Sequence, residues 1–142
     1  MLIFVLPRTV SAQEDANRVS VVAPTDLGDV VQRVARRSGE FKEEFTKAVE
    51  HSLIDGTRLE NNAKHRADDL HDAAKKLQDV FGDKKDKNNP AVRERVDRTL
   101  AAASDLNHVM QDHRFTEKVQ HDWDLLRSDL NALAAVYDLT PL

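Results

Sequence analysis

The sequence contains no cysteine, and it has four glycines and four prolines among 142 residues. The absence of cysteine excludes disulfide bonds, Fe–S clusters, thiol nucleophiles, covalent c-type haem attachment and the cysteine-linked lipid anchor of lipoproteins. Because runs of β-branched residues are also few, the chain has little from which to build a β-sheet. We therefore expect an all-α fold.

Long blocks of like charge are absent too. The 21 Lys and Arg residues are interleaved with 25 Asp and Glu residues, and the formal net charge is −4. Since a nucleic-acid-binding face needs clustered positive charge, we expect no nucleic-acid partner. The apolar run at residues 1–5 is far shorter than a membrane-spanning helix, and we expect no transmembrane span in the mature chain.

The clearest periodic pattern lies between residues 115 and 139. Apolar residues there recur at alternating steps of four and three, which places them along one stripe of an α-helix. The stripe consists of Val119, Trp123, Leu126, Leu130, Leu133 and Tyr137 and includes the single Trp and the single Tyr of the chain. A helix with one apolar stripe and a charged back buries the stripe against other helices, so the pattern predicts a helix bundle.

Three further helices are predicted upstream, at about residues 26–52, 57–81 and 90–110, and the last helix at about 115–138. Thr57 with Glu60 forms a capping-box pattern, and Asn89 before Pro90 is typical of a helix start. Gly56 is typical of a helix end, and Gly39 falls near the solvent side of the first helix. We expect an antiparallel, up-down-up-down four-helix bundle over residues 25–142, which is one domain.

The core is expected to combine large apolar residues of all four helices: Val30, Phe41, Phe45, Leu70, Leu77, Phe81, Val96, Trp123, Leu126, Leu130 and Tyr137. In the second helix the stripe begins at Leu59, and a spacing of eleven connects Leu59, Leu70 and Phe81. An eleven-residue spacing predicts a straight or slightly right-handed helix pair, whereas the last helix repeats at seven.

The N-terminus predicts export. An apolar run, Pro7 and then Val10-Ser11-Ala12 resemble the end of a secretory signal peptide, with cleavage after Ala12. We interpret residues 1–12 as the remnant of a signal peptide and residues 13–24 as a flexible leader. The mature protein is then periplasmic or secreted.

Six histidines raise the question of a metal site. His108, Asp112, His113 and His121, with Asp122, could converge at the turn between the third and fourth helices, and imidazole with carboxylate suits zinc, copper or nickel. The alternative is that polar residues crowd a solvated turn. No Glu-x-x-His spacing supports a di-iron bundle, and Met110 has no histidine partner for haem, so we expect no cofactor.

Enzymatic motifs are missing. The chain has no Gly-x-Ser-x-Gly, no glycine-rich phosphate loop and no His-Glu-x-x-His, and we assign no catalytic residue. Two basic clusters are flanked by acids and are interpreted as solubilising surface. They are Arg33, Arg36 and Arg37 in the first helix and Lys84, Lys85 and Lys87 in the charged loop that follows the second.

The C-terminal helix resembles that of small exported helical-bundle proteins of bacteria. The resemblance rests on Trp123, Leu126-Arg127, Asp129-Leu130-Asn131, Leu133-Ala134 and Tyr137, and on Asp55-Gly56-Thr57 at the first hairpin. It implies a bundle and export, and no functional residue.

Three hypotheses on function follow. The first is a non-enzymatic binding or structural protein of the bacterial envelope, whose partner is another envelope protein or a second copy of the chain. The second is an exported metal-binding protein that uses the histidines at the turn between the third and fourth helices. The third is a periplasmic chaperone-like protein, although the Leu-Thr-x-x-Gln signature of small periplasmic chaperones is absent.

Overall fold

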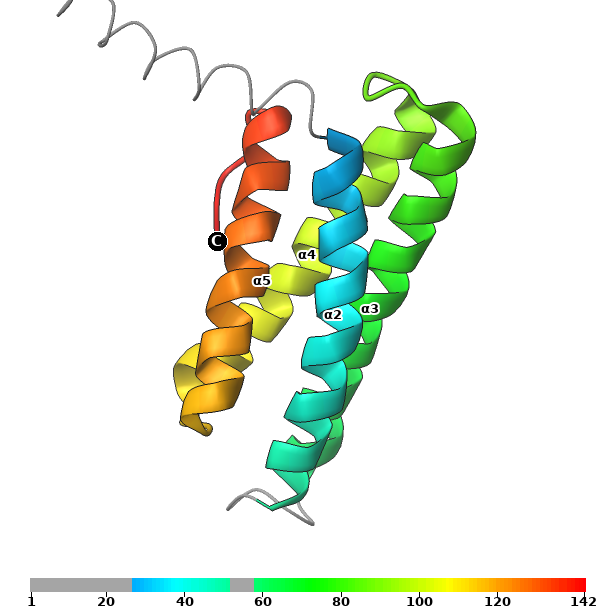
Figure 1. Ribbon diagram of the computed structural model, residues 1–142. Coiled ribbons are helices and arrows are strands. Elements are labelled where there is room, and N and C mark those ends of the chain that lie inside the picture. The colour runs from blue at the N-terminus through cyan, green and yellow to red at the C-terminus, as the bar shows by residue number, and fades with distance from the viewer. Residues whose placement is uncertain (1–26, 52–57) are drawn as a thin grey trace, which may run out of the picture.

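The computed structural model of the protein describes residues 27–51 and 58–142. These residues form four long helices that lie side by side (Figure 1): α2 (Leu27–Glu50), α3 (Arg58–Lys84), α4 (Pro90–Asp112) and α5 (Glu117–Val136). The expected signal-peptide remnant, the leader and the Asp55-Gly56-Thr57 turn lie outside the described residues. None of the helices in the described ranges is both long and apolar enough to cross a membrane.

The helices form an antiparallel four-helix bundle, as the sequence predicts. Helix α2 packs against α3 and α5, and α4 packs against the same two helices. Contacts along the α2–α3 seam show the antiparallel direction, because the partners of Lys42 and Glu50 are Asp68 and Lys64 respectively, each at 3.1 Å. Each helix therefore packs against two neighbouring helices and exposes its remaining face to solvent.

The interior is filled by the expected apolar residues. Ten of the eleven predicted core residues are at most 7% exposed, and Trp123 is 2% exposed. Phe81 is the exception, since it is partly buried and packs against the rim of the core. The prediction of a closed apolar core is confirmed.

The packing period of α3 differs from the prediction. Its buried residues alternate at steps of three and four, so they repeat at seven rather than eleven: Glu60, Ala63, Ala67, Leu70, Ala74 and Leu77. A seven-residue repeat keeps one seam facing the neighbouring helices along the whole bundle. Leu59, at which the eleven-residue spacing starts, lies beside this seam and is 48% exposed, whereas Phe81 continues the seven-residue repeat and packs at the end of the core. The assignment of Leu59 to the stripe was wrong for this reason.

Helix α3 also ends later than predicted, at Lys84. Gly82 lies inside the helix, and the residue that adopts the left-handed conformation is Lys85, with φ of 53°. The Lys85 N–H donates to the Phe81 carbonyl at 2.7 Å and so caps the helix. The next helix begins as expected, since the Asn89 side chain accepts a hydrogen bond from the N–H of Ala91.

Helix α5 ends two residues earlier than predicted, in a Schellman motif. The N–H of Asp138 donates to Ala135 at 3.2 Å, and that of Leu139 donates to Ala134 at 2.9 Å. Asp138 takes the left-handed position, with φ of 54°. The last residues then fold back beside α5, where the Leu142 N–H donates to Asn131 Oδ1 at 2.7 Å (Figure 1).

Replacing Asp138 by Gly should therefore stabilise the protein. Glycine adopts the left-handed conformation without the steric cost of a Cβ atom, and we expect the free energy of unfolding to rise by about 0.5–1 kcal/mol. Urea denaturation followed by circular dichroism measures this change. Asp138→Ala is the matched control, in which no gain is expected. Equal stabilisation in both variants would contradict the explanation.

Candidate functional site

The predicted metal ligands at the α4–α5 turn do not converge. His108 and His121 are exposed on their helices, as is Asp112. The half-buried His113 turns its ring to Phe115 instead, in an edge-on contact with 6.3 Å between ring centroids. Within residues 27–51 and 58–142, no three His, Asp or Glu side chains are arranged to hold a metal ion.

The fifth metal candidate, Asp122, has another partner. Its Oδ2 atom lies 3.0 Å from the Lys118 ammonium nitrogen, one turn earlier on α5. The hydrogen bond to Asp122 is the main reason why the pKa of Lys118 is raised. This exposed pair belongs to the solvated face of the helix.

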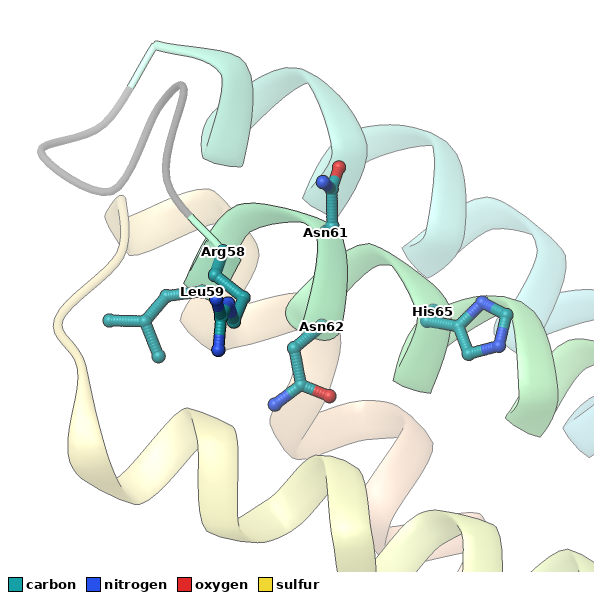
Figure 2. Close-up of a pocket in the computed structure, with 5 residues that line it drawn as sticks. All are labelled: Arg58, Leu59, Asn61, Asn62 and His65. Carbon is teal, nitrogen blue, oxygen red and sulfur yellow. The ribbon is translucent and has the colours of Figure 1, made fainter.

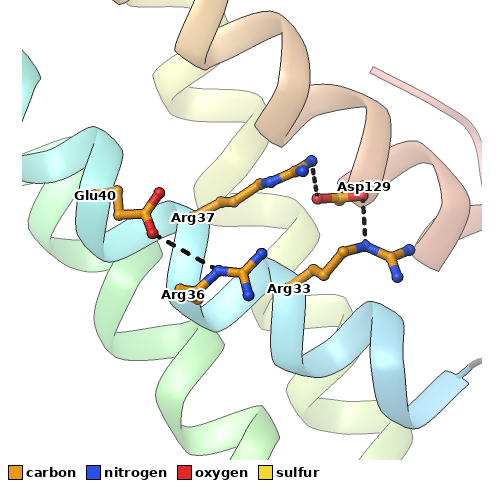
Figure 3. A network of polar contacts seen from close by, with 5 residues as sticks. All are labelled: Arg33, Arg36, Arg37, Glu40 and Asp129. Atoms are coloured by element: carbon orange, nitrogen blue, oxygen red, sulfur yellow. Dashed lines mark hydrogen bonds and ion pairs between the residues drawn. The ribbon is translucent and has the colours of Figure 1, made fainter.

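A buried carboxylate joins α2 to α5 (Figure 3). Asp129 is 6% exposed, and each of its oxygens has an arginine partner. The Nε atom of Arg33 lies 3.1 Å from Oδ1, and the Nη1 atom of Arg37 lies 2.7 Å from Oδ2. We call these three residues the Arg–Asp–Arg clamp. Both carboxylate oxygens are occupied, so the clamp binds one helix to the other.

The clamp corrects the interpretation of the basic cluster on α2. Arg33 and Arg37 are four residues apart and share a helix face, which allows both to reach the same carboxylate. Arg36 points elsewhere and lies 3.7 Å from Glu40 (Figure 3). Only Arg36 therefore fits the predicted role of solubilising surface.

A serine and a histidine meet at the α2–α3 seam. The Ser38 Oγ atom lies 3.1 Å from His71 Nδ1 and donates its hydrogen to the Ala35 carbonyl at 2.9 Å. Since a hydroxyl has one hydrogen, the His71 tautomer that fits this arrangement is the one that donates its Nδ1–H to Ser38. A catalytic serine needs the opposite direction, because its base accepts the hydroxyl proton. The pair thus has the wrong polarity for nucleophilic catalysis, and Ser38 is 1% exposed.

His71 is neutral at pH 7 in this environment. Burial lowers its pKa below the ordinary 6.5, and the positive charges of Lys42 and Lys75 lower the pKa further. Asp72 and a hydrogen bond to the Ala35 backbone oppose this effect.

Gly39 lies under the His71 ring and not on the solvent side of α2, so that prediction was wrong. A Cβ atom at Gly39 would be 2.9 Å from Cε1 of His71. The helix continues through this position without a break. Gly39 thus provides the space in which the imidazole of the neighbouring helix packs.

Gly39→Ala should for this reason fail to stabilise the protein. In a free helix the exchange gains about 1 kcal/mol, but here the added methyl group collides with a ring that Ser38 holds. We expect no gain or a loss in the free energy of unfolding. On the background His71→Ala, the same exchange should stabilise by about 1 kcal/mol. Chemical denaturation of the four proteins forms a double-mutant cycle, and additive effects would contradict the assigned contact.

An open hollow lies at the start of α3 (Figure 2), with a volume of about 610 Å³. We call it the α3 hollow. It is lined by Arg58, Leu59, Asn61, Asn62 and His65. Leu59 lies beside Arg58, and the side chains of Asn61 and Asn62 extend in opposite directions (Figure 2). The described lining thus combines a half-exposed leucine with two amides and two basic side chains.

The sequence analysis did not predict the Arg–Asp–Arg clamp, the Ser38–His71 contact or the α3 hollow. The resemblance to small exported helical-bundle proteins stays a prediction. Comparisons of the chain with protein-family models, with curated proteins and with solved structures found no match.

Proposed function

We propose that the protein is a non-enzymatic binding protein of the bacterial envelope, which holds a protein partner at the α3 hollow. The observation that supports this proposal best is Leu59, a large apolar side chain that is 48% exposed beside a closed core. An apolar side chain in a concavity with an arginine beside it is a common centre of a protein–protein interface.

The polar pairs at the helix seams support a non-enzymatic role. Asp129 has both oxygens engaged by arginines, and the Ser38 hydroxyl donates to its own helix. A general base or a nucleophile needs a free lone pair or a transferable proton within reach of a substrate. The oxygens of Asp129 instead hold α5 against α2, and the Ser38 hydroxyl is engaged within α2.

The lining of the α3 hollow indicates the chemistry of the partner. Arg58 and His65 are basic residues, Asn61 and Asn62 offer amide donors and acceptors, and none of the described lining residues is a carboxylate. Such a surface complements an apolar side chain flanked by acidic residues. The partner is a protein segment of this kind, either in another envelope protein or in a second copy of the chain.

Export is the second part of the proposal, and it rests on the sequence of residues 1–12. Cleavage after Ala12 would leave Gln13 as the first residue of the mature protein. Intact mass measurement of the protein recovered from an envelope fraction tests this directly. A full-length mass in the cytoplasmic fraction would contradict it.

Leu59→Ser should abolish partner binding without unfolding the protein. The side chain lies outside the buried seam, so its loss removes the apolar contact and leaves the core intact. We expect the wild-type protein to capture a defined partner from envelope extract and the variant to lose at least about tenfold in affinity for it. Surface plasmon resonance with the purified partner gives the affinity.

Leu125→Ser is the matched control, because Leu125 is 39% exposed on α5 and does not line the hollow. It should bind as the wild type does. Sedimentation equilibrium of the purified protein shows whether the partner is a second copy of the chain. Equal capture by both variants, or no specific capture by the wild type together with a monomer in solution, would contradict the proposed binding role.

A further inference from the structure

A second open depression follows the seam between α2 and α3, apart from the α3 hollow. We call it the α2–α3 groove, and its volume is about 560 Å³. The described residues that line it are Gln32, Ala35, Arg36, His71, Lys75 and Gln78. They provide basic groups and amides, and none of these described residues is a carboxylate. This composition stands out on a chain with a net charge of −4.

The groove is built by helix spacing. Gln32 and Arg36 are four residues apart on α2, and His71, Lys75 and Gln78 follow one another at four and three on α3. Residues at these spacings share one helix face. Because the two helices are antiparallel, the two faces meet with Gln32 near the Gln78 end and Arg36 near the Lys75 end. Basic groups from both walls thus border one space.

The ion pair of Arg36, on the α2 wall of the groove, is weak. Arg36 has Glu40 as its ion-pair partner at 3.7 Å, and the two side chains are 62% and 67% exposed. Such a pair is long and screened by water, so it leaves the guanidinium free to bind another anion. Lys42 is held by Asp68 at 3.1 Å, farther along the seam.

His71 adds a charge that depends on pH. In the tautomer that donates its Nδ1–H to Ser38, the neutral ring carries its lone pair on Nε2, and protonation of Nε2 adds a positive charge. The charged groups that act on it are Lys42 from α2 and Lys75 and Asp72 from α3, and Arg36 of α2 lines the same groove. Acid therefore makes the wall of the groove more positive.

We propose that the α2–α3 groove binds a small phosphate-bearing molecule, whose phosphate group is held by Arg36 and Lys75 beside His71 and whose remaining polar atoms reach Gln32 and Gln78. A guanidinium offers paired donors to phosphate oxygens, and an ammonium adds a point charge. The two amides donate to and accept from hydroxyl or carbonyl groups.

The dimensions favour a small ligand over a membrane surface. A volume of about 560 Å³ lies in the range of small-molecule sites. Binding to a lipid surface uses exposed large apolar side chains together with basic ones. Among the described residues of the lining, only Ala35 is apolar, and it is 5% exposed.

The groove predicts that anion binding is coupled to protonation of His71. The pKa of His71 is lowered in the free protein, so the ring is neutral at about pH 8 and takes up a proton as the pH falls below 6.5. An anion in the groove stabilises the protonated ring and must raise this pKa. By the same linkage, acid must strengthen the binding of an anion whose own charge stays constant.

The test is an NMR titration of the purified full chain with inorganic phosphate at constant ionic strength, with chloride as the reference anion. We expect saturable amide shifts confined to residues 32–36 and 71–78. Sulfate, which remains a dianion over the whole range, serves for the pH series, and the ring shifts of His71 give its pKa. Saturating sulfate should raise the pKa of His71, and sulfate should bind more tightly at about pH 5.5 than at about pH 8.

The variant Arg36→Gln with Lys75→Gln should weaken phosphate binding by about tenfold or more, since both charge-assisted contacts are lost. Both residues are exposed, so the fold is kept. The matched control, Lys76→Gln with Arg98→Gln, removes the same charge from exposed positions outside the groove and should bind like the wild type. Shifts that spread over the surface, equal weakening in both variants, or a response to phosphatidylglycerol vesicles and not to free phosphate would overturn the proposal.

Discussion

Trp123→Ala should lower the free energy of unfolding by about 3–5 kcal/mol, which is a large share of the stability of a small domain. Trp123 is 2% exposed and packs on Phe41 of α2, with 5.5 Å between the ring centroids. Phe41 in turn stacks on Phe45 at 5.1 Å, and Phe45 meets Phe115 at 5.0 Å. The indole is the end of this aromatic row, and its loss opens a cavity at the centre of the bundle.

The indole also connects a third helix. Its Nε1–H donates to Asn107 Oδ1 of α4 at 3.3 Å, so one side chain of α5 contacts both α2 and α4. Trp123→Phe keeps part of the aromatic contact and loses this hydrogen bond, and we expect it to cost less than the alanine exchange.

Equilibrium urea denaturation, monitored by circular dichroism, gives these values. Leu125→Ala is the control on the same helix, because Leu125 is 39% exposed and should cost less than about 1 kcal/mol. A loss for Trp123→Ala as small as that of the control would show that the core does not close around the indole.

The fold could be predicted because it depends mainly on the periodic spacing of apolar residues within each helix. The stripe from Val119 to Tyr137 gave both the existence of α5 and the face that it buries, and Asn89 with Pro90 placed the start of α4. The predicted positions of the helix ends were less accurate, because Lys85 and Asp138 adopt a left-handed conformation that glycine usually adopts at a helix end. A reader of the sequence looks for glycine at such positions and finds Gly82, which is helical.

The contacts between helices could not be read from one sequence. Asp129 follows Leu126 by three residues and so lies at the edge of the stripe, which is a signal for burial that was available. Its partners Arg33 and Arg37 are more than ninety residues away, and their identity depends on which helices become neighbours. The place of Gly39 under His71 depends on the register of α2 against α3 in the same way.

Leu59 shows how two neighbouring positions at the start of a helix can compete for the core. Both Leu59 and Glu60 lie near the stripe of α3, and apolarity alone favours Leu59 for the core. The structure buries Glu60, which pairs with Lys64 at 2.8 Å, and leaves Leu59 at the surface. The seven-residue seam decides this choice, and the exposed leucine becomes a candidate for binding.

Replacing Arg33 and Arg37 together by Met should destabilise the protein by about 3 kcal/mol or more. Methionine keeps most of the aliphatic packing of arginine but removes both positive charges from Asp129. The carboxylate is 6% exposed, so it would remain largely out of water without a partner. The control is Arg36→Met, which breaks only the exposed pair with Glu40 and should change the stability by less than about 0.5 kcal/mol.

The triple variant, in which Asp129→Leu is added to the two methionine substitutions, separates the cost of an unpaired buried charge from the cost of lost arginine packing. If the penalty of the double variant comes from an uncompensated buried charge, its removal should restore most of the wild-type stability, because an apolar replacement of a buried ion pair is often neutral or stabilising. Thermal and urea denaturation of the three proteins, at equal ionic strength, measure this recovery. A triple variant no more stable than the double variant would mean that the arginines stabilise the α2–α5 contact by packing, and that the charge of Asp129 is not what binds the two helices together.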